Sequence, residues 1–361
     1  MTLTIAPGLE LTDARLRRVI ALHFDPKDGS PYWLERERQL GVDAREAIRS
    51  HEDLSLLGPM DAEALASRPI EDFLPASLLS RRTEFIVAET GGTLGRPKFA
   101  VHRADEFHAA FVEPFVIAAG RAGFPRGENW LFIGPTGPHI IGKAARCCAQ
   151  AMGSADPFAV DFDPRWAKKL PEDSFARTRY LKHIEAQALR VIESQRIGVI
   201  FGTPPVLDSL CARMAPEKHE AIRGIHFGGL PVSAALRERL AGMFPNAVML
   251  SGYGNTLFGM SPELAFDPER GIDYFPHSTR LVIRVVEKGD VKAPLVPYGE
   301  RGQVMVHRLD ETQFIANMIE RDTAVRIQPR ADAADDGFVL DGIRDPQPIR
   351  DEMTKPAVGL Y

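Results

Sequence analysis

Nine residues, TGGTLGRPK at positions 90–98, combine glycines, threonine hydroxyl groups and a lysine in one short segment. Glycine and proline are strong turn formers, so one interpretation is a tight turn with an exposed lysine. The other is a loop that binds a phosphate chain, because backbone N–H groups, hydroxyl groups and an ammonium group together suit a polyanion. In that case the binding groups belong to Thr90, Gly91, Gly92, Thr93, Gly95 and Lys98.

This segment is not the Walker phosphate-binding loop. That motif joins a strand to a helix and requires G-x-x-x-x-G-K-[ST]. Here Pro97 precedes Lys98, Phe99 follows it, and Pro97 removes one N–H donor. The flanking segments FIVA and FAVH are apolar, so we expect the loop to connect two strands.

Two more glycine-containing segments follow apolar runs. In FGGLPVS, residues 227–233, Gly228 and Gly229 form either an ordinary strand-to-helix turn or a place where a flat ligand approaches the backbone. In SGYGNTLFG, residues 251–259, Tyr253 lies between glycines. Its ring either stacks against a base or belongs to the core at a turn.

The elements that must position these segments change along the chain. Residues 10–70 alternate amphipathic runs with polar breaks, which predicts a helical N-terminal region. From about residue 83, short β-branched runs end in glycine or proline and precede helical patterns, such as the one that Ser233 is predicted to cap. This alternation predicts an α/β fold. After residue 279 the pattern predicts a β meander, with a subdomain boundary near 262–280.

Composition limits the classes of function. The 361 residues suggest one large domain with subdomains, or two to three domains, and the net charge of -5 offers no basic surface for nucleic acid. The N-terminus lacks a signal-peptide pattern and no apolar run approaches a membrane span, so we expect a cytoplasmic protein. Three cysteines give neither a disulfide framework nor a C-x-x-C metal pattern.

Taken in order, five segments resemble the adenylate-forming superfamily of acyl-CoA and aryl-CoA ligases, in its phenylacetate-ligase-like branch. TGGTLGRPK resembles that family's T-S-G-T-T-G-x-P-K loop, GGLPVS its G-G-A-P-L-S segment and GYGNT its Y-G-x-T-E segment. IERDTAVRI resembles its T-R-D segment and GIRDP its G-R-x-D segment. The similarity spans roughly residues 30–346. In length and arrangement the chain is most similar to compact members that act in phenazine-antibiotic biosynthesis.

The resemblance implies a fold and a division of the chain. We expect the α/β large N-terminal domain of adenylate-forming enzymes, with helix-packed β-sheets and a smaller β subdomain, and without the mobile C-terminal domain. The expected parts are a helical region (1–80), a nucleotide- and acyl-binding core (81–262), a β-rich subdomain (263–345) and a C-terminal tail (346–361).

The resemblance also implies an activity. We expect ATP-dependent activation of an aryl, phenazine-type carboxylic acid to an acyl-adenylate, with release of pyrophosphate, in secondary-metabolite biosynthesis. ATP or AMP is the expected cofactor, with Mg²⁺ carried by ATP and no protein metal site. A small carboxylic acid is the expected substrate and a downstream acceptor protein the expected partner, with neither nucleic acid nor membrane involved.

Residue roles follow from the same resemblance. Lys98 adds positive charge near the leaving pyrophosphate, Thr256 lies near the α-phosphate, and His139 gates the passage between the ATP and acyl sites or is a packed structural residue. The expected nucleotide-binding residues are Thr90, Gly91, Gly92, Thr93, Gly95, Gly228, Gly229, Leu230, Pro231, Tyr253 at adenine, Gly254, Asn255, Thr256, Asp322 at the ribose and Arg344 at the ribose or a phosphate. The expected substrate-binding residues are His139, Gly202, Thr203 and Ser251.

Departures from the family pattern leave alternatives open. Gly91 and Leu94 stand where hydroxyl residues are usual, and Leu257 replaces a carboxylate that helps to hold Mg²⁺. One alternative is therefore a catalytically weak nucleotide-binding partner. Another is an acyl-protein synthetase or transferase with a thioester on Cys147 or Cys148, although the small apolar residues beside them also suit a buried helix face.

Overall fold

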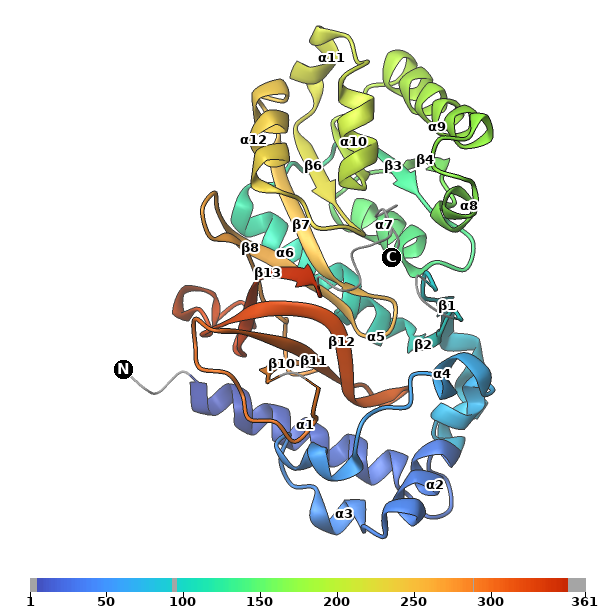
Figure 1. Ribbon diagram of the computed structural model, residues 1–361, viewed down its shortest axis with the longest axis vertical. Coiled ribbons are helices and arrows are strands. Elements are labelled where there is room, and N and C mark those ends of the chain that lie inside the picture. Colours follow the sequence, from blue (N-terminus) through green and yellow to red (C-terminus); the bar gives the residue numbers. More distant parts are fainter. Residues whose placement is uncertain (1–4, 93–95, 288, 350–361) are drawn as a thin grey trace.

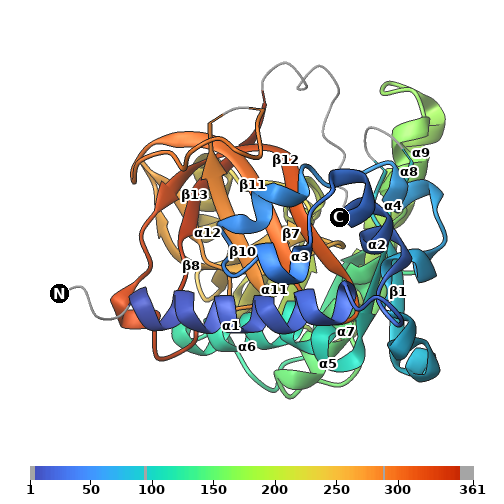
Figure 2. The same ribbon diagram turned by 90° about the horizontal axis from the view of Figure 1, so that it is seen from below.

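The N-terminal region is helical. In the computed structural model, which describes residues 5–92, 96–287 and 289–349, the first helix, α1, covers one side of the later strands (Figure 2). Its buried Leu16, Val19 and Ile20 recur at helical spacing, so one face is apolar. The helical elements of this region are α1 (Ile5–His23), α2 (Pro31–Leu40), α3 (Ala44–Ala47), η1 (Asp53–Leu57), α4 (Ala64–Ser67), η2 (Ile70–Phe73) and η3 (Ala76–Glu84).

Two antiparallel strands, β1 (Phe85–Glu89) and β2 (Phe99–Arg103), form a small sheet of their own. They flank the loop at 90–98, which confirms that the loop connects two strands. Its described ends are joined by two hydrogen bonds: Thr90 N donates to Lys98 O at 2.9 Å, and Lys98 N donates to Thr90 Oγ1 at 2.9 Å. Thr93, Leu94 and Gly95 lie outside the described residues.

The remaining strands form one eleven-stranded sheet in the order β10-β11-β12-β13-β9-β8-β7-β6-β5-β3-β4. Pairing from β4 to β7 is parallel, and from β7 to β10 it is antiparallel. The parallel strands are β3 (Trp130–Gly134), β4 (Phe158–Asp161), β5 (Val199–Gly202), β6 (Gly224–Phe227) and β7 (Val248–Asn255). The others are β8 (Gly259–Asp267), β9 (Gly271–Tyr274), β10 (Leu281–Val286), β11 (Arg301–Leu309), β12 (Phe314–Ile327) and β13 (Gly342–Pro348).

Helices cover both faces of the parallel strands (Figure 1). Burial on both faces accounts for their continuous apolar runs, since neither side of such a strand meets water. One face packs on α5 (Ala104–Phe107), the π-helical η4 (His108–Val112), α6 (Glu113–Ala122) and α7 (Ile140–Ala151). The other face packs against α9 (Phe175–Ser194), α10 (Pro204–Cys211) and α12 (Ala234–Met243), with α8 (Pro164–Lys169) and α11 (Pro216–Ala221) beside them.

The local predictions of strands and caps agree with these elements. The segments predicted as strands around the three glycine-containing loops are β1, β2, β6 and β7. Ser233 caps α12 by accepting a hydrogen bond from Leu236 N at 3.2 Å. Strands β10 to β13 are consecutive antiparallel neighbours, which confirms the meander. The α/β class is confirmed as well.

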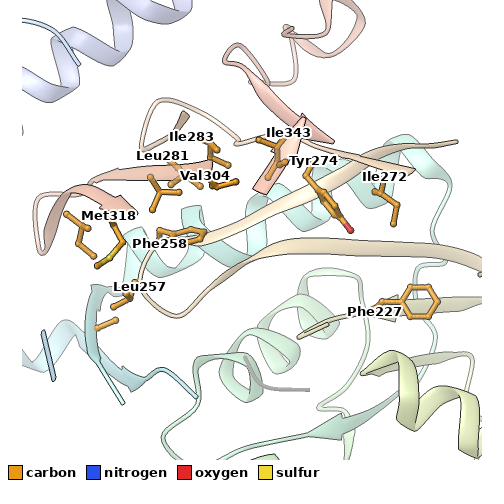
Figure 3. Close-up of a cluster of buried hydrophobic side chains, with 14 of the residues drawn as sticks. Phe227, Leu257, Phe258, Ile272, Tyr274, Leu281, Ile283, Val304, Met318 and Ile343 are labelled. Carbon is orange, nitrogen blue, oxygen red and sulfur yellow. The ribbon is translucent and has the colours of Figure 1, made fainter. Parts of the chain in front are cut away.

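The parallel and antiparallel parts share a hydrophobic core. One buried cluster includes Phe227 of β6, Tyr274 of β9 and Ile343 of β13 (Figure 3). The boundary expected at 262/263 falls inside β8, and the one at 345/346 falls inside β13. The division of the chain into four parts therefore stays a prediction. In the described ranges, no helix is both long and apolar enough to cross a bilayer.

Candidate functional site

A cavity of about 940 Å³, called here the large cavity, lies where the β1–β2 loop, the segment after β6, the end of β7 and strand β12 meet. The parallel strands β6 and β7 direct their carboxyl ends toward it, the edge where open α/β sheets bind ligands. Predicted residues that line the large cavity are Thr90, Gly91, Gly92, Lys98, Gly229, Leu230, Pro231, Tyr253, Gly254, Asn255 and Asp322.

The β1–β2 loop supplies positive charge to the large cavity. Lys98 is half-buried and, among the described residues, no carboxylate lies within ion-pair distance of its ammonium group. Arg96 is exposed, and its only close carboxylate in the described part of the chain is Glu63, at 3.8 Å. The charge of Lys98 favours the ionised form of Glu320 across the cavity without a close ion pair among the described residues, which leaves the ammonium group available to an anionic ligand.

The opposite wall carries carboxylates from β12. Glu320 and Asp322 are alternate residues of this strand, and both line the large cavity. Tyr253 donates its phenol hydrogen bond to Asp322 Oδ2 at 3.1 Å, and Asn255 Nδ2 donates to Glu320 Oε2 at 3.4 Å. Sequence reasoning missed Glu320, although its position two residues before Asp322 was the signal that could have found it.

Burial and neighbouring negative charge raise the pKa values of Glu320 and Tyr253, two side chains of the large cavity. Burial, followed by the neighbouring Asp322 carboxylate, raises the pKa of Glu320 to about 7. Burial, with Asp322 and Glu320 adding to it, raises the pKa of the Tyr253 phenol well above its ordinary value. The phenol therefore stays protonated and acts as a hydrogen-bond donor.

A second cavity of about 50 Å³, called here the small cavity, adjoins the large cavity and lies between η4, α7 and the strands β5 to β8. Its walls include Phe111, Ile140, Phe201 and Met260 and are mainly apolar. Four residues line both cavities: Gly229, Gly252, Gly254 and Asn255. The two cavities therefore adjoin along glycine backbone and a single amide side chain.

Gly228 and Thr256 line the small cavity rather than the large one. The Thr256 hydroxyl donates to the Glu89 carbonyl at 3.2 Å, and the Thr256 carbonyl accepts from His102 Nε2 at 3.0 Å. These bonds tie the β7–β8 turn to the small β1–β2 sheet. In this structure Thr256 therefore holds the two glycine-containing loops together.

His139 lines neither cavity. It precedes α7 as the N-cap residue, is 2% exposed, and has no hydrogen-bond partner within the described residues for either ring nitrogen. Burial, followed by the positive charge of Arg165, lowers the pKa of its imidazole. The neutral ring is the favoured form.

Four other predicted residues also lie outside the lining of both cavities: Gly202, Thr203, Ser251 and Arg344. Gly202 ends β5 and Thr203 is the buried N-cap residue of α10. The Ser251 hydroxyl bonds with Glu263 Oε2 at 2.9 Å and Tyr274 Oη at 2.8 Å. The Arg344 guanidinium makes two hydrogen bonds to the Asp273 carboxylate, one of them 2.7 Å long. The Ser251 and Arg344 side chains are thus directed to protein partners.

The surroundings of Cys147 and Cys148 disfavour the thiolate form. Cys148 lines the small cavity, is buried, and its thiol donates to the Phe111 carbonyl at 3.6 Å. Burial raises the pKa of the Cys148 thiol, and also that of the half-buried Cys147. Since the thiolate is the nucleophilic form, both environments disfavour attack on an acyl group.

A buried charge cluster connects the walls of the large cavity. Asp310 accepts hydrogen bonds from Arg308 Nε at 2.7 Å and Arg280 Nε at 3.1 Å. The two guanidinium groups also donate to backbone: Arg308 to Leu257 O at 3.0 Å and Val101 O at 2.7 Å, and Arg280 to Phe258 O at 2.8 Å. The cluster fixes β2 against the β7–β8 turn, and with it the loop that carries Lys98.

Within residues 5–92, 96–287 and 289–349, no group of three or more His, Cys, Asp or Glu side chains is arranged to hold a metal ion. Carboxylates that line the large cavity are Glu269, Glu320, Asp322 and Asp345.

No protein-family model matches the chain. A 2-succinylbenzoate–CoA ligase, chloroplastic/peroxisomal, of Arabidopsis thaliana is 24% identical over 201 residues, which are 55% of this chain and 31% of that ligase. The match therefore spans less than a third of the length of this curated relative.

Solved structures extend the similarity along the whole chain. A crystal structure of 2-hydroxyisobutyryl-CoA ligase in the postadenylation state, in complex with R3-HIB-AMP, has a TM-score of 0.70 and 15% identity and covers 100% of this chain and 71% of that ligase. The same ligase in complex with 2-HIB-AMP and CoA, in its thioesterification state, gives a TM-score of 0.66 and 16% identity over 96% of this chain and 68% of the ligase. The chain thus has the α/β fold, with a large mixed sheet, of the adenylate-forming CoA ligases.

Proposed function

We propose that the chain uses ATP to activate a small carboxylic acid as an acyl-adenylate, and so acts as a carboxylate–AMP ligase. The observation that carries this proposal is the pair of cavities that adjoin along glycine backbone. The large cavity has a mixed polar and apolar lining that includes Lys98, and the small cavity is mainly apolar. An acid in the small cavity and a nucleotide in the large one would bring their reacting ends together. The CoA-ligase fold supports the same reaction.

The nucleotide is proposed to lie along the large cavity. Tyr253 and the backbone of residues 229–231 would contact adenine, and the Asp322 carboxylate would accept hydrogen bonds from the ribose hydroxyl groups. The glycines and hydroxyl group of the β1–β2 loop, together with Lys98, would contact phosphates. Mg²⁺ is proposed to enter with ATP, because the triphosphate supplies oxygen ligands that the metal prefers.

The proposed step needs no general base. A carboxylate oxygen attacks the α-phosphorus, the bond from that phosphorus to the bridging oxygen breaks, and pyrophosphate leaves with the bonding electron pair. Alignment and neutralisation of the growing negative charge lower the barrier. Lys98 is the residue proposed to neutralise that charge, since it lines the cavity without a carboxylate partner among the described residues.

The proposal also covers the class of carboxylic acid and the acceptor of its activated acyl group. The motif resemblance favours an aryl or phenazine-type acid in secondary metabolism, with coenzyme A or an acceptor protein receiving the acyl group. The volume of the small cavity, about 50 Å³, is well below the roughly 150 Å³ of a cavity that holds benzene. An aryl acid would therefore require the walls around Phe111 and Ile140 to move apart.

A nucleotide-binding protein without catalysis is the second candidate. Leu257 is the observation that favours it, because this buried side chain supplies no ligand to a metal ion. A thioester on Cys148 has less support, since burial raises the pKa of that thiol.

ATP–pyrophosphate exchange with a panel of carboxylic acids tests the proposal. We expect acid-dependent exchange by the wild-type chain, and nucleotide binding that depends on Asp322. Nucleotide binding without exchange for any acid would favour the non-catalytic candidate. Trapping of labelled acyl group on the protein, lost in Cys148→Ala, would favour the thioester candidate.

A further inference from the structure

The small cavity contains one buried polar group that its protein neighbours leave unused. His226, on β6, is 4% exposed, and its ring packs against Phe201 and Phe115 with centroid distances of 4.3 and 4.7 Å. These aromatic rings belong to the core on the same face of the sheet as the small cavity, and His226 lines that cavity. The imidazole is thus part of the cavity wall.

Hydrogen bonding fixes the tautomer of this imidazole. Nδ1 lies 3.2 Å from the Leu250 carbonyl, which can only accept, so Nδ1 carries the proton. Burial lowers the pKa of His226 to about 4, so the ring is neutral near pH 7. Nε2 is therefore a lone-pair acceptor, and no group in the described part of the chain donates to it.

The other polar groups of the small cavity already have partners. The Cys148 thiol donates to the Phe111 carbonyl, and the Thr256 hydroxyl donates to the Glu89 carbonyl. Asn255 donates to Glu320 through Nδ2 and accepts from Leu257 N through Oδ1 at 2.9 Å. His226 Nε2 is thus an acceptor that has no protein donor and that is not sealed from the cavity, so a molecule in the small cavity can donate a hydrogen bond to it.

We propose that the small cavity selects a short aliphatic carboxylic acid that bears a hydroxyl group, and that His226 Nε2 accepts the hydrogen bond from this hydroxyl. The inference rests on the proposed function, since the acid is the one to be activated beside the glycine backbone along which the two cavities adjoin. The volume of about 50 Å³ favours short acyl groups over groups as large as a benzene ring. A neutral hydroxyl suits an apolar cavity better than a charged ammonium group, which would lose its hydration.

Matched pairs of acids test the selection. ATP–pyrophosphate exchange is measured with lactate against propionate, 3-hydroxybutyrate against butyrate, and with benzoate as the bulky acid. We expect at least one hydroxy acid to exceed its deoxy analogue about 10- to 100-fold in kcat/KM, because a site built for a hydroxyl rejects the analogue that leaves its acceptor unpaired. Equal kcat/KM values for the hydroxy acid and its deoxy analogue in each pair, or a higher kcat/KM for benzoate, would overturn the proposal.

Two substitutions assign the selection to His226. His226→Phe keeps an aromatic ring and removes the acceptor, so the hydroxy-to-deoxy ratio should fall to about 1 while exchange with the deoxy acid persists. His226→Gln restores an acceptor oxygen and should recover part of the ratio. His219→Phe changes a histidine of α11 that lines neither cavity, and should leave the ratio unchanged. An unchanged ratio in His226→Phe would refute the role of Nε2.

Binding separates failure of this inference from failure of the proposed function. Saturation-transfer NMR measures binding of each acid to the full chain without any requirement for catalysis. Selective binding of the hydroxy acid that is lost in His226→Phe, in the absence of exchange, would support the inference and refute the ligase activity. Pyrophosphate exchange that does not distinguish hydroxy acids from their deoxy analogues would support the ligase activity and refute the inference. If His226→Phe does not fold, the comparison of hydroxy and deoxy acids on the wild type still decides the outcome.

Discussion

The phenol of Tyr253 donates a hydrogen bond to Asp322 at 3.1 Å, and so joins two residues that are 69 positions apart in the chain. The pair connects the end of β7 to β12 across the large cavity. A ligand hydroxyl that binds Asp322 must share its carboxylate with this phenol. The Tyr253 to Asp322 bond therefore presets the orientation of the carboxylate before a nucleotide binds.

Asp322→Ala should weaken nucleotide binding by about 1.5–3 kcal/mol, or roughly 10- to 150-fold, because hydrogen bonds to a charged group are lost. Isothermal titration with AMP measures the effect. Asp332→Ala serves as the control, since this exposed aspartate pairs with Arg330 and lies outside the large cavity. Unchanged affinity in folded Asp322→Ala protein would remove the residue from the proposed site.

Lys98→Ala should lower the pyrophosphate-exchange rate more than nucleotide affinity, because negative charge on the departing pyrophosphate grows toward the transition state. We expect a rate loss of about 100-fold or more, with affinity changed less than about 10-fold. Lys98→Arg keeps the charge and should retain more activity. Equal losses in rate and affinity would assign Lys98 to ground-state binding alone.

Glu320 should make the protein less stable as the pH rises from about 4.5 to about 7. Its pKa is raised from 4.5 to about 7 in the folded chain, so between these values the folded state holds a proton that the unfolded state has lost. Above pH 7 the half-buried carboxylate is charged in both states, and its ionisation then destabilises the folded chain by up to about 3 kcal/mol.

Glu320→Gln should remove this cost. Denaturant unfolding at pH 5 and pH 8 measures it: the variant should gain stability over the wild type at pH 8 and little at pH 5. The exposed Glu300→Gln is the matched control and should show no such difference. Equal gains at both pH values would show that Glu320 does not titrate in this range.

Asp310→Asn should destabilise the fold by about 3–5 kcal/mol, because it leaves two buried guanidinium groups without their carboxylate. The Arg280 and Arg308 guanidinium groups hold the pKa of Asp310 below its usual range despite its burial. A depressed pKa means that the contribution is present above about pH 4 and is lost as the pH falls. The exposed pair of Asp156 with Arg146 gives the control: Asp156→Asn should cost no more than about 1 kcal/mol. A similar small loss in Asp310→Asn would contradict the role of the cluster.

Local chemistry in the sequence predicted the loops that form the large cavity. Glycine, proline and cap residues act over a few positions, so the β1–β2 turn and the Ser233 cap were predictable from neighbours alone. The partner of Arg344 could not be predicted from neighbouring residues. Its partner Asp273 lies opposite it in the pairing of β13 with β9, and that pairing depends on the order of eleven strands.

His226 and Glu320 were missed in the sequence because their roles also depend on contacts between distant parts of the chain. In the sequence, His226 lies within an apolar run that predicts a buried strand. The space beside its ring exists only because of the way α7 and η4 pack on the sheet. Glu320 acquires its raised pKa from burial and from Asp322, and burial is a property of the assembled walls. The sequence therefore predicted which loops meet, while the electrostatics of the site required the packed structure.

Helix α1, through Arg15, and helix α2, through Trp33, are anchored to strands that are synthesised much later. Arg15 Nε donates to the Leu309 carbonyl at 2.6 Å, 294 positions along the chain, and Trp33 Nε1 donates to the Phe314 carbonyl at 3.2 Å. Translation proceeds from the N-terminus, so the apolar face of α1 has no native surface to cover until β11 and β12 have left the ribosome. Closure of such distant contacts is slow, and nascent chains that stop before β11 would expose Leu16, Val19 and Ile20 to chaperones and proteases.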